Sequence, residues 1–191
     1  MTKILKNIEL QLVENKLPIF GFDLSTREYE LNLAREAIAE MKVSHPEPRQ
    51  SNVYGEWMSP KNSHQLNDKF KPLCDLVINI TTQVWCDVFL GGKEPHEVPG
   101  TEFRIWQCWA IEYGDGGHAA SHNHFPSFFS CVLYLESDAE SAPIIFGNNT
   151  LRPAIKNAFY LFPGVLQHEV PQNKGRRVAI AMNILKKNPD E

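Results

Sequence analysis

The sequence predicts a mainly β fold of the α+β class, in which helices cover one side of a β core. Three observations support this prediction. Five apolar, β-forming segments follow one another at short spacing after about residue 100. Glycine, proline and asparagine separate these segments, as is typical of a sandwich or barrel. Two segments with helical periodicity precede them, and no linker divides the two parts.

The length of 191 residues suits a single domain spanning 1–191. Within it we expect a helix-rich N-terminal part over residues 1–92 and a β core over residues 100–185. Weak alternation in Ile8–Val13 predicts a short strand near the start of the chain.

The first predicted helix begins at Ser25-Thr26-Arg27-Glu28, which has the pattern of a capping box. His45-Pro46-Glu47-Pro48 ends it, because proline disfavours helical geometry in the residue before it. The apolar face expected to pack on the core consists of Leu33, Ala34, Ala37, Ile38 and Met41.

The second predicted helix has the stronger periodicity. Its regular part should begin near residue 71, because Pro72 is tolerated only in a first turn. Gly91-Gly92 should end it. The residues that step by threes and fours along one face are Leu66, Phe70, Leu73, Val77, Ile80 and Val84.

The β core is predicted from segments rich in β-branched and aromatic residues. The first two are the longest. The five segments are Glu102–Tyr113, Phe128–Glu136, Ala142–Phe146, Ala158–Phe162 and Val178–Ile184.

Composition and charge argue against several classes of function. The net charge of -4 indicates no general affinity for nucleic acid or anionic membranes. No window is apolar enough to span a bilayer, and the N-terminus lacks the apolar run of a signal peptide. The four cysteines show no CxxC spacing, so we expect buried, reduced side chains. A soluble, cytoplasmic protein is therefore expected.

Seven histidines are present, and three of them fall within seven residues after a predicted strand. In a strand-like segment, His122 and His124 point to the same side. His168 follows His124 by 44 residues, and Arg177 lies nine residues further on. Any one of these histidines alone is explained as a loop or core residue, but their order along the chain favours a metal site.

That order fits the chemistry of iron(II) oxygenases, which need three protein ligands on one face of the metal. Those that use 2-oxoglutarate chelate it on the iron and need a cation for its far carboxylate. An arginine on the strand after the distal ligand suits this role, since its guanidinium binds a carboxylate bidentately. Arg177 is placed in this way.

At these residues the chain resembles the 2-oxoglutarate–Fe(II) oxygenase superfamily, in particular its prolyl-hydroxylase-like branch. Tyr113-Gly114-Asp115-Gly116 leads to His122, six residues after Gly116, at the position of the first iron ligand. His168 matches the distal ligand and Arg177 the cosubstrate arginine. His124 falls where the superfamily usually has aspartate or glutamate.

A little-studied group of bacterial and phage 2-oxoglutarate–Fe(II) oxygenases resembles the chain more closely, over roughly residues 50 to 185. The matching pieces, in order, are Ser51–Trp57, His122-Asn123-His124-Phe125-Pro126, Ser130, Leu133-Tyr134-Leu135, Phe162-Pro163, His168-Glu169-Val170, Arg177 and Asn183. The resemblance implies a double-stranded β-helix, or jelly-roll, core with N-terminal helices packed on one sheet.

Several alternatives stay open for individual residues. His118 could replace His124 as a ligand, because strand alternation puts it on the same side as His122. Tyr113, Tyr134 and Asn183 are candidates for cosubstrate binding. Arg176 should point away from the site, since it neighbours Arg177 on a strand.

The resemblance implies an Fe(II)- and O₂-dependent dioxygenase that hydroxylates an aliphatic C–H bond and converts 2-oxoglutarate to succinate and CO₂. Its ligands would be His122, His124 and His168, with a small-molecule or peptidyl substrate. A three-histidine cupin-type dioxygenase without 2-oxoglutarate is one alternative. A non-catalytic jelly-roll binding module is another.

Overall fold

Two antiparallel β-sheets face each other in the computed structural model, which describes residues 17–47, 51–93, 95–98, 102–147 and 149–187. The first sheet has six strands, in the spatial order β1 (Phe20–Asp23), β9 (Ala158–Pro163), β6 (Phe129–Ser137), β11 (Arg177–Lys186), β4 (Phe103–Tyr113) and β3 (Trp57–Met58). The second has five, in the order β2 (Val53–Tyr54), β5 (His118–His122), β10 (His168–Val170), β7 (Ile144–Phe146) and β8 (Thr150–Arg152).

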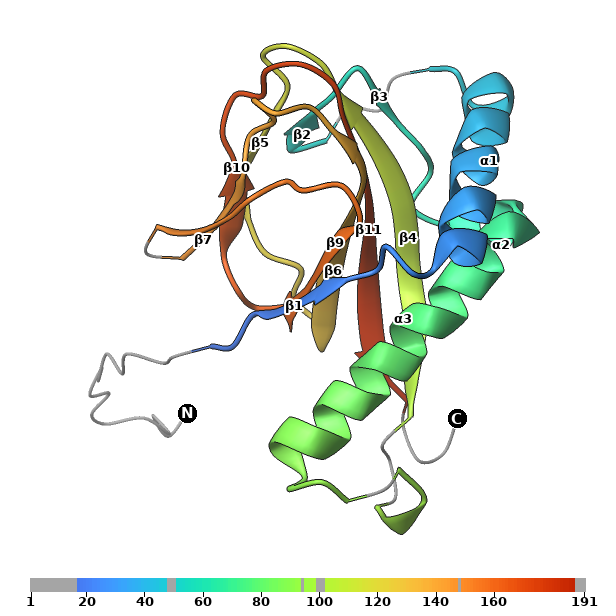
Figure 1. Ribbon diagram of the computed structural model, residues 1–191, viewed down its shortest axis with the longest axis vertical. Helices are drawn as coiled ribbons and strands as arrows, with labels where there is room; N and C mark the ends of the chain where they lie inside the picture. The colour runs from blue at the N-terminus through green and yellow to red at the C-terminus, as the bar shows by residue number, and fades with distance from the viewer. Residues whose placement is uncertain (1–16, 48–50, 94, 99–101, 148, 188–191) are drawn as a thin grey trace, which may run out of the picture.

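The helices lie against the outer face of the six-stranded sheet, while the five-stranded sheet stands on its other side (Figure 1). This arrangement confirms the predicted jelly-roll core with helices packed on one sheet. The helical segments are α1 (Glu28–Ser44), α2 (Ser63–Leu66), α3 (Lys71–Val84), the short 3₁₀ turns Asp68–Phe70 and Pro95–Glu97, and a π-helical turn at Trp85–Phe89.

Successive side chains of β11 point alternately into two hydrophobic cores, one on each face of the six-stranded sheet. Val178, Ile180 and Met182 pack toward the helices. Ala179 and Ala181 face the space between the sheets, on the same side as Arg177. Because these two inward residues are small, room is left between the sheets beside Arg177.

The capping-box prediction for α1 is wrong. The N-cap residue is Arg27, without a side-chain cap, and the Ser25 hydroxyl instead donates to the Asp23 carboxylate at 2.9 Å. The local Asp23–Ser25 turn therefore replaces the cap. On the buried face of α1, Leu31 takes the place predicted for Leu33, which is half-buried.

The start of α3 at Lys71 confirms the predicted beginning of the second helix. The α-helix ends at Val84, earlier than predicted, and a π-helical turn continues it to Phe89, just before Gly91 and Gly92 with their positive φ angles. On the predicted apolar face Leu66 is an exception, because it ends the separate helix α2 and is 50% exposed. The strand expected at 8–13 lies outside the described residues. No helix in the described ranges combines the length and apolar character that crossing a bilayer requires.

Candidate metal centre

His122 and His168 stand directly opposite each other on neighbouring strands. The register pairs His168 of β10 with His122 of β5, and the ring centroids are 4.4 Å apart. Two residues later the register has shifted, so that Val170 pairs with Ala119. One extra residue therefore sits on β5, which is a β-bulge, a feature that re-aims side chains near functional sites.

The bulge decides the orientation of His118. Ala119 and His122 both face the interior although they are three residues apart. His118 consequently faces away and stacks on the exposed Tyr54 ring, with centroids 4.4 Å apart. The expectation from regular alternation, that His118 shares the side of His122, is wrong for this reason.

His124 reaches the same space from the loop that follows β5. Its ring centroid lies 5.0 Å from that of His122 and 4.9 Å from that of His168. Its backbone N–H donates to the Gly164 carbonyl at 2.7 Å, and its own carbonyl accepts from the Ser127 N–H at 2.8 Å. Two backbone hydrogen bonds thus hold this loop residue in position.

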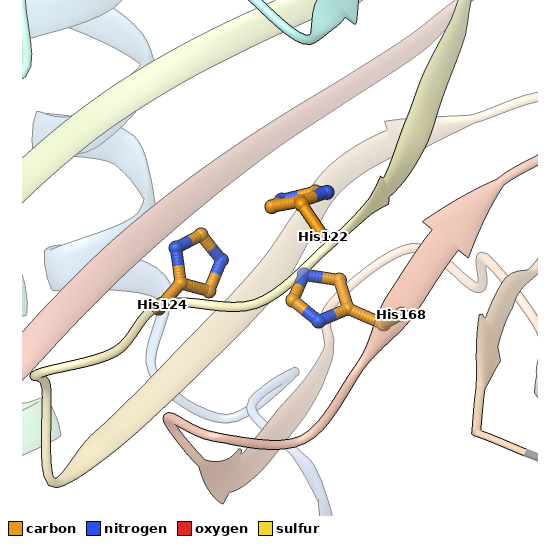
Figure 2. Close-up of side chains that lie close together, drawn as sticks. All are labelled: His122, His124 and His168. Atoms are coloured by element: carbon orange, nitrogen blue, oxygen red, sulfur yellow. The ribbon is translucent and has the colours of Figure 1, made fainter.

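One ring nitrogen from each of His122, His124 and His168 lies within 4.8 Å of the other two (Figure 2). The Nδ1 atoms of His122 and His168 are each in hydrogen-bond contact with a backbone carbonyl, of Ala120 at 2.7 Å and of Leu166 at 2.9 Å. A carbonyl partner at Nδ1 leaves Nε2 as the atom that can bind a metal. The arrangement is a three-histidine candidate metal centre.

Burial keeps these imidazoles neutral. It lowers the pKa of His124 to about 3 and that of His168 to about 4, with help from the neighbouring histidines. The pKa of His122 is also lowered, mainly by burial. Because a metal binds the unprotonated ring, all three are ready ligands at neutral pH.

Arg177 is a buried cation on the inner face of β11, with only 1% of its surface exposed. The guanidinium lies over the rings of Tyr113 and Tyr134, 4.9 and 4.8 Å from their centroids. Nη1 donates to the Ala142 carbonyl and Nη2 to the Tyr134 hydroxyl, both at 3.1 Å. Its Nε is buried and has no hydrogen-bond partner.

Within the described ranges no carboxylate forms an ion pair with Arg177. Burying a cation without a counter-charge is unfavourable. The unpartnered Nε and the missing counter-charge together favour an anionic ligand at this place. A carboxylate is the group whose geometry the guanidinium matches.

Tyr113 completes this end of the cavity. Burial raises the pKa of its hydroxyl to about 12, although Arg177 acts in the opposite direction. The hydroxyl therefore stays protonated, and no residue in the described part of the chain accepts its hydrogen bond. It is available as a donor to the same anion.

One cavity connects the three histidines with Arg177. Small side chains at Ala119, Ala179 and Ala181 keep it open. The rest of its wall is mostly apolar and includes Val53, Trp109, Ile111, Tyr113, Ile144, Phe162 and Val170. Such a wall excludes water and strengthens electrostatic interactions inside.

The structure does not bring all the expected residues into this cavity. Tyr134 is fully buried beneath Arg177 and accepts its hydrogen bond, so it orients the guanidinium. Asn183 faces inward as its position on β11 implies, but it accepts from Ser130 at 3.0 Å and donates to Gln107 at 2.7 Å.

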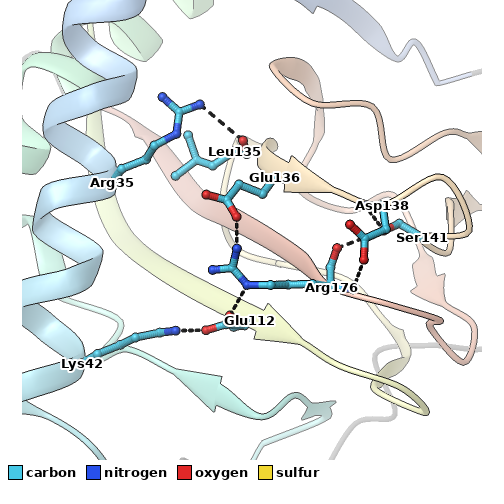
Figure 3. A network of polar contacts seen from close by, with 8 residues as sticks. All are labelled: Arg35, Lys42, Glu112, Leu135, Glu136, Asp138, Ser141 and Arg176. Carbon is cyan, nitrogen blue, oxygen red and sulfur yellow. Dashed lines mark hydrogen bonds and ion pairs between the residues drawn. The ribbon is translucent and has the colours of Figure 1, made fainter.

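Arg176, next to Arg177, points to the opposite side of the sheet, as the sequence predicts. It pairs with Glu112 and Glu136, and Lys42 of α1 pairs with the same Glu112 (Figure 3). These ion pairs link α1 to strands β4 and β6. The two adjacent arginines therefore have separate environments, one partnered by carboxylates and one without any.

Lys61 is a residue near the centre that the sequence did not single out. Its ammonium lies 5.5 Å from the centroid of the Trp109 ring, which in turn is 5.8 Å from the ring of His124. Its charge contributes to the lowered pKa of His122 and His124. No motif marks Lys61, because its approach to Trp109 depends on the tertiary fold.

Gly164 offers a test of how His124 is held. A Cβ at this position would overlap the backbone carbonyl of Ser127, in the loop that carries His124. We expect Gly164→Ala to displace the loop and to weaken Fe(II) binding by about tenfold or more. Losses of this size are typical when a residue that holds a metal ligand in position is changed. Anaerobic metal titration measures this. Gly21→Ala is the control, since its Cβ approaches only the Tyr160 ring at 3.3 Å; equal loss in both variants would contradict the account.

No protein-family model and no curated protein sequence matches the chain. Solved structures do match it. A prolyl-4-hydroxylase from Pseudomonas putida aligns with a TM-score of 0.59 and 13% identity, over 89% of this chain and 93% of that one. A 2OG-Fe(II) oxygenase family oxidoreductase from Burkholderia pseudomallei aligns with a TM-score of 0.61 and 15% identity, over 89% and 85%.

A viral collagen prolyl hydroxylase from Paramecium Bursaria Chlorella virus-1, solved with 2-oxoglutarate, aligns with a TM-score of 0.53 and 15% identity, over 87% of this chain and 94% of that one. At these identities the similarity is one of fold. All three alignments extend over most of both chains.

Proposed function

Because the chain has the fold of prolyl-hydroxylase-like 2OG-Fe(II) oxygenases, we propose that it is a non-haem iron(II) oxygenase that uses 2-oxoglutarate. The observation that carries this proposal is the buried Arg177, which has an unpartnered Nε and shares one cavity with three neutral histidines. A metal centre and a carboxylate-binding cation on the same cavity are the two features that this chemistry requires.

His122, His124 and His168 would hold the iron. Three neutral nitrogen ligands on one side of a metal leave its other positions for cosubstrate and O₂. The carbonyl contacts at Nδ1 of His122 and His168 fix their ring orientation and increase their basicity. Bound Fe(II) with 2-oxoglutarate supplies O₂ activation, which couples decarboxylation to succinate and CO₂ with hydroxylation of an aliphatic C–H bond.

Arg177 and Tyr113 would bind the far carboxylate of 2-oxoglutarate. The guanidinium would neutralise it and the Tyr113 hydroxyl would donate a hydrogen bond, while Tyr134 holds the guanidinium in place. The apolar wall would keep water from the reacting end. A cupin-type dioxygenase without 2-oxoglutarate would have no use for this buried cation, which is why we favour the cosubstrate-dependent reaction.

His124 stands where related enzymes usually have a carboxylate, so the site has one more positive charge. We expect His124→Asp to retain Fe(II) but to weaken 2-oxoglutarate binding by about tenfold, because the added negative charge opposes the dianion. Anaerobic calorimetry measures both affinities. His124→Asn is the neutral control, and an equal effect of Asn and Asp on 2-oxoglutarate would rule out the charge explanation.

The proposed reaction is tested by O₂-dependent turnover of 2-oxoglutarate. With 2-oxoglutarate and with ascorbate as the two-electron reductant, iron-loaded protein should form succinate when O₂ is admitted, even without a prime substrate, as uncoupled turnover. Succinate formation should need both Fe(II) and O₂. Iron-bound protein that never forms succinate but oxidises other compounds without 2-oxoglutarate would favour the cupin-type alternative, and protein that binds no iron would favour a binding module.

A further inference from the structure

A second cavity, of about 600 Å³, lies beside the candidate metal centre. Its volume is in the range of small-molecule sites. Its lining residues are Ser51, Met58, Lys61, Asn62, Gln65, Trp106 and Gln107. Among its described lining residues there is one cation and three amides, and none is acidic.

Trp109 lies between Lys61 of this groove and the metal centre. Its ring lines the cavity of the three histidines, 5.8 Å from His124 between centroids. The Lys61 ammonium of the groove lies 5.5 Å from the same ring. A molecule in the groove would therefore have its charged groups next to Lys61, with the Trp109 ring between Lys61 and His124.

The charge of Lys61 is not balanced by the protein. The side chain is exposed, and in the described segments no carboxylate forms an ion pair with it. Its ammonium lies over the face of the Trp109 ring. This leaves all three N–H donors of the ammonium for a ligand or water.

A β-bulge brings Trp106 and Gln107 into the groove. Asn183 of β11 pairs with Gln107 and the next residue, Ile184, pairs with Ile105, so Trp106 is the extra residue. Both Trp106 and Gln107 line the groove as a result. Trp106 is 38% exposed and offers an aromatic face beside the polar groups.

A chain of hydrogen bonds reaches Gln107. The Ser130 hydroxyl lies 3.0 Å from both the Met182 carbonyl oxygen and Asn183 Oδ1, and Asn183 Nδ2 donates to Gln107 Oε1 at 2.7 Å. The Gln107 oxygen is therefore used, and its amide NH₂ remains as a donor. Among the described residues nothing accepts from this NH₂.

We propose that this groove binds the substrate through a carboxylate, which takes hydrogen bonds from the Lys61 ammonium and the Gln107 amide. This inference rests on the proposed oxygenase function and names its substrate class: a carboxylic acid with an apolar part that packs on Trp106. Lys61 and Gln107 are both unpartnered donors, and the absence of acidic lining residues in the described part favours an anion.

The net charge of the metal centre also bears on the charge of the substrate. With three neutral histidines, Fe(II) and Arg177 would together carry three positive charges, and the dianion 2-oxoglutarate would neutralise two of them. The loaded centre would keep one positive charge, which favours an anionic substrate. Lys61 carries the unpaired charge on the groove side, and this positive charge favours a negatively charged ligand.

The test uses equilibrium dialysis of the protein loaded anaerobically with Fe(II) and saturating 2-oxoglutarate, so that Arg177 is already engaged. The probes are N-acetyl-L-amino acids and their matched carboxamides. We expect the wild type to bind its best acids about tenfold or more tightly than the corresponding amides, as expected for a charge-assisted pair. The preference should fall below about twofold in Lys61→Met and persist in Lys61→Arg.

Gln107→Glu provides a second variant. Its carboxylate can still accept the Asn183 hydrogen bond, so the local fold is retained, but a negative charge replaces the NH₂ donor. We expect this variant to lose the preference for acids. A wild type that shows no preference, or a preference that survives both Lys61→Met and Gln107→Glu, would overturn the proposal.

Different results would contradict the carboxylate groove and the proposed oxygenase function. Binding of 2-oxoglutarate is titrated separately, with and without Fe(II), and its affinity should be unchanged in all groove variants. If 2-oxoglutarate binds only with iron but acids show no advantage over amides, the carboxylate groove is wrong and the proposed function stands. If 2-oxoglutarate does not bind, the proposed function fails, and the preference of the groove for acids is still scored.

Discussion

Arg177→Met is expected to weaken 2-oxoglutarate binding by about 100-fold or more while leaving Fe(II) binding intact. The guanidinium is the only candidate cation on the described wall of the cavity that holds the three histidines. Charge-assisted hydrogen bonds contribute about 1.5–3 kcal/mol each, and a bidentate pair would lose two. Anaerobic calorimetry with iron-loaded protein measures the change.

The same substitution separates a binding role from a structural one. Arg177 is buried without a carboxylate partner in the described ranges, so its removal relieves an uncompensated buried charge. We therefore expect ligand-free Arg177→Met to unfold at the same temperature as the wild type or higher. A purely structural arginine would show a lower Tm, and that outcome would contradict our reading.

Arg176→Met is the matched control. Arg176 is adjacent in sequence but pairs with Glu112 and Glu136 on the helix-facing side of the sheet (Figure 3). Its loss should leave 2-oxoglutarate affinity unchanged within about twofold, because charges outside the cavity are screened. Equal losses of affinity in both variants would mean that overall charge, and not the position of Arg177, controls binding.

His168→Ala is expected to reduce Fe(II) affinity by more than about 100-fold, exceeding the 10- to 100-fold losses typical of supporting residues. His168 is the most buried of the three candidate ligands, and its position is fixed by strand pairing with His122. Anaerobic titration with a competing chelator measures the affinity. Binding of 2-oxoglutarate should fall with it, because its chelating end would lose the metal.

His118→Ala controls for the general loss of an imidazole. His118 belongs to the same strand as His122 but stacks on Tyr54, outside the cavity. We expect its iron affinity to equal that of the wild type. Iron binding that survives His168→Ala but not His118→Ala would place the metal elsewhere.

The long strands and helices were predictable because each is an extended run with a clear period. β4, β6 and β11 are long and buried, and α3 begins where Pro72 requires. The short strands β2, β5 and β10 were not predicted as such, since segments of two to five residues contain too few side chains to show a period. Their position depends on pairing with distant segments.

The order of candidate site residues was visible in sequence, but their geometry was not. Register alone places His168 opposite His122, and a bulge that no local pattern marks turns His118 away. Asn183 faces inward because it lies six residues after Arg177 on the same strand. Its side chain is nevertheless hydrogen-bonded to Ser130 and Gln107. Lys61 and Trp106 reach the groove only through tertiary contacts and a second bulge.

The measurement that tests the central claim most directly is a 2-oxoglutarate titration of the wild-type protein under anaerobic conditions, with and without Fe(II). We predict one iron and one 2-oxoglutarate per chain, with a visible charge-transfer band that appears only when both are bound. Binding of 2-oxoglutarate that does not depend on iron, or no binding to the iron-loaded protein, would contradict the assignment of His122, His124, His168 and Arg177 to one oxygenase site.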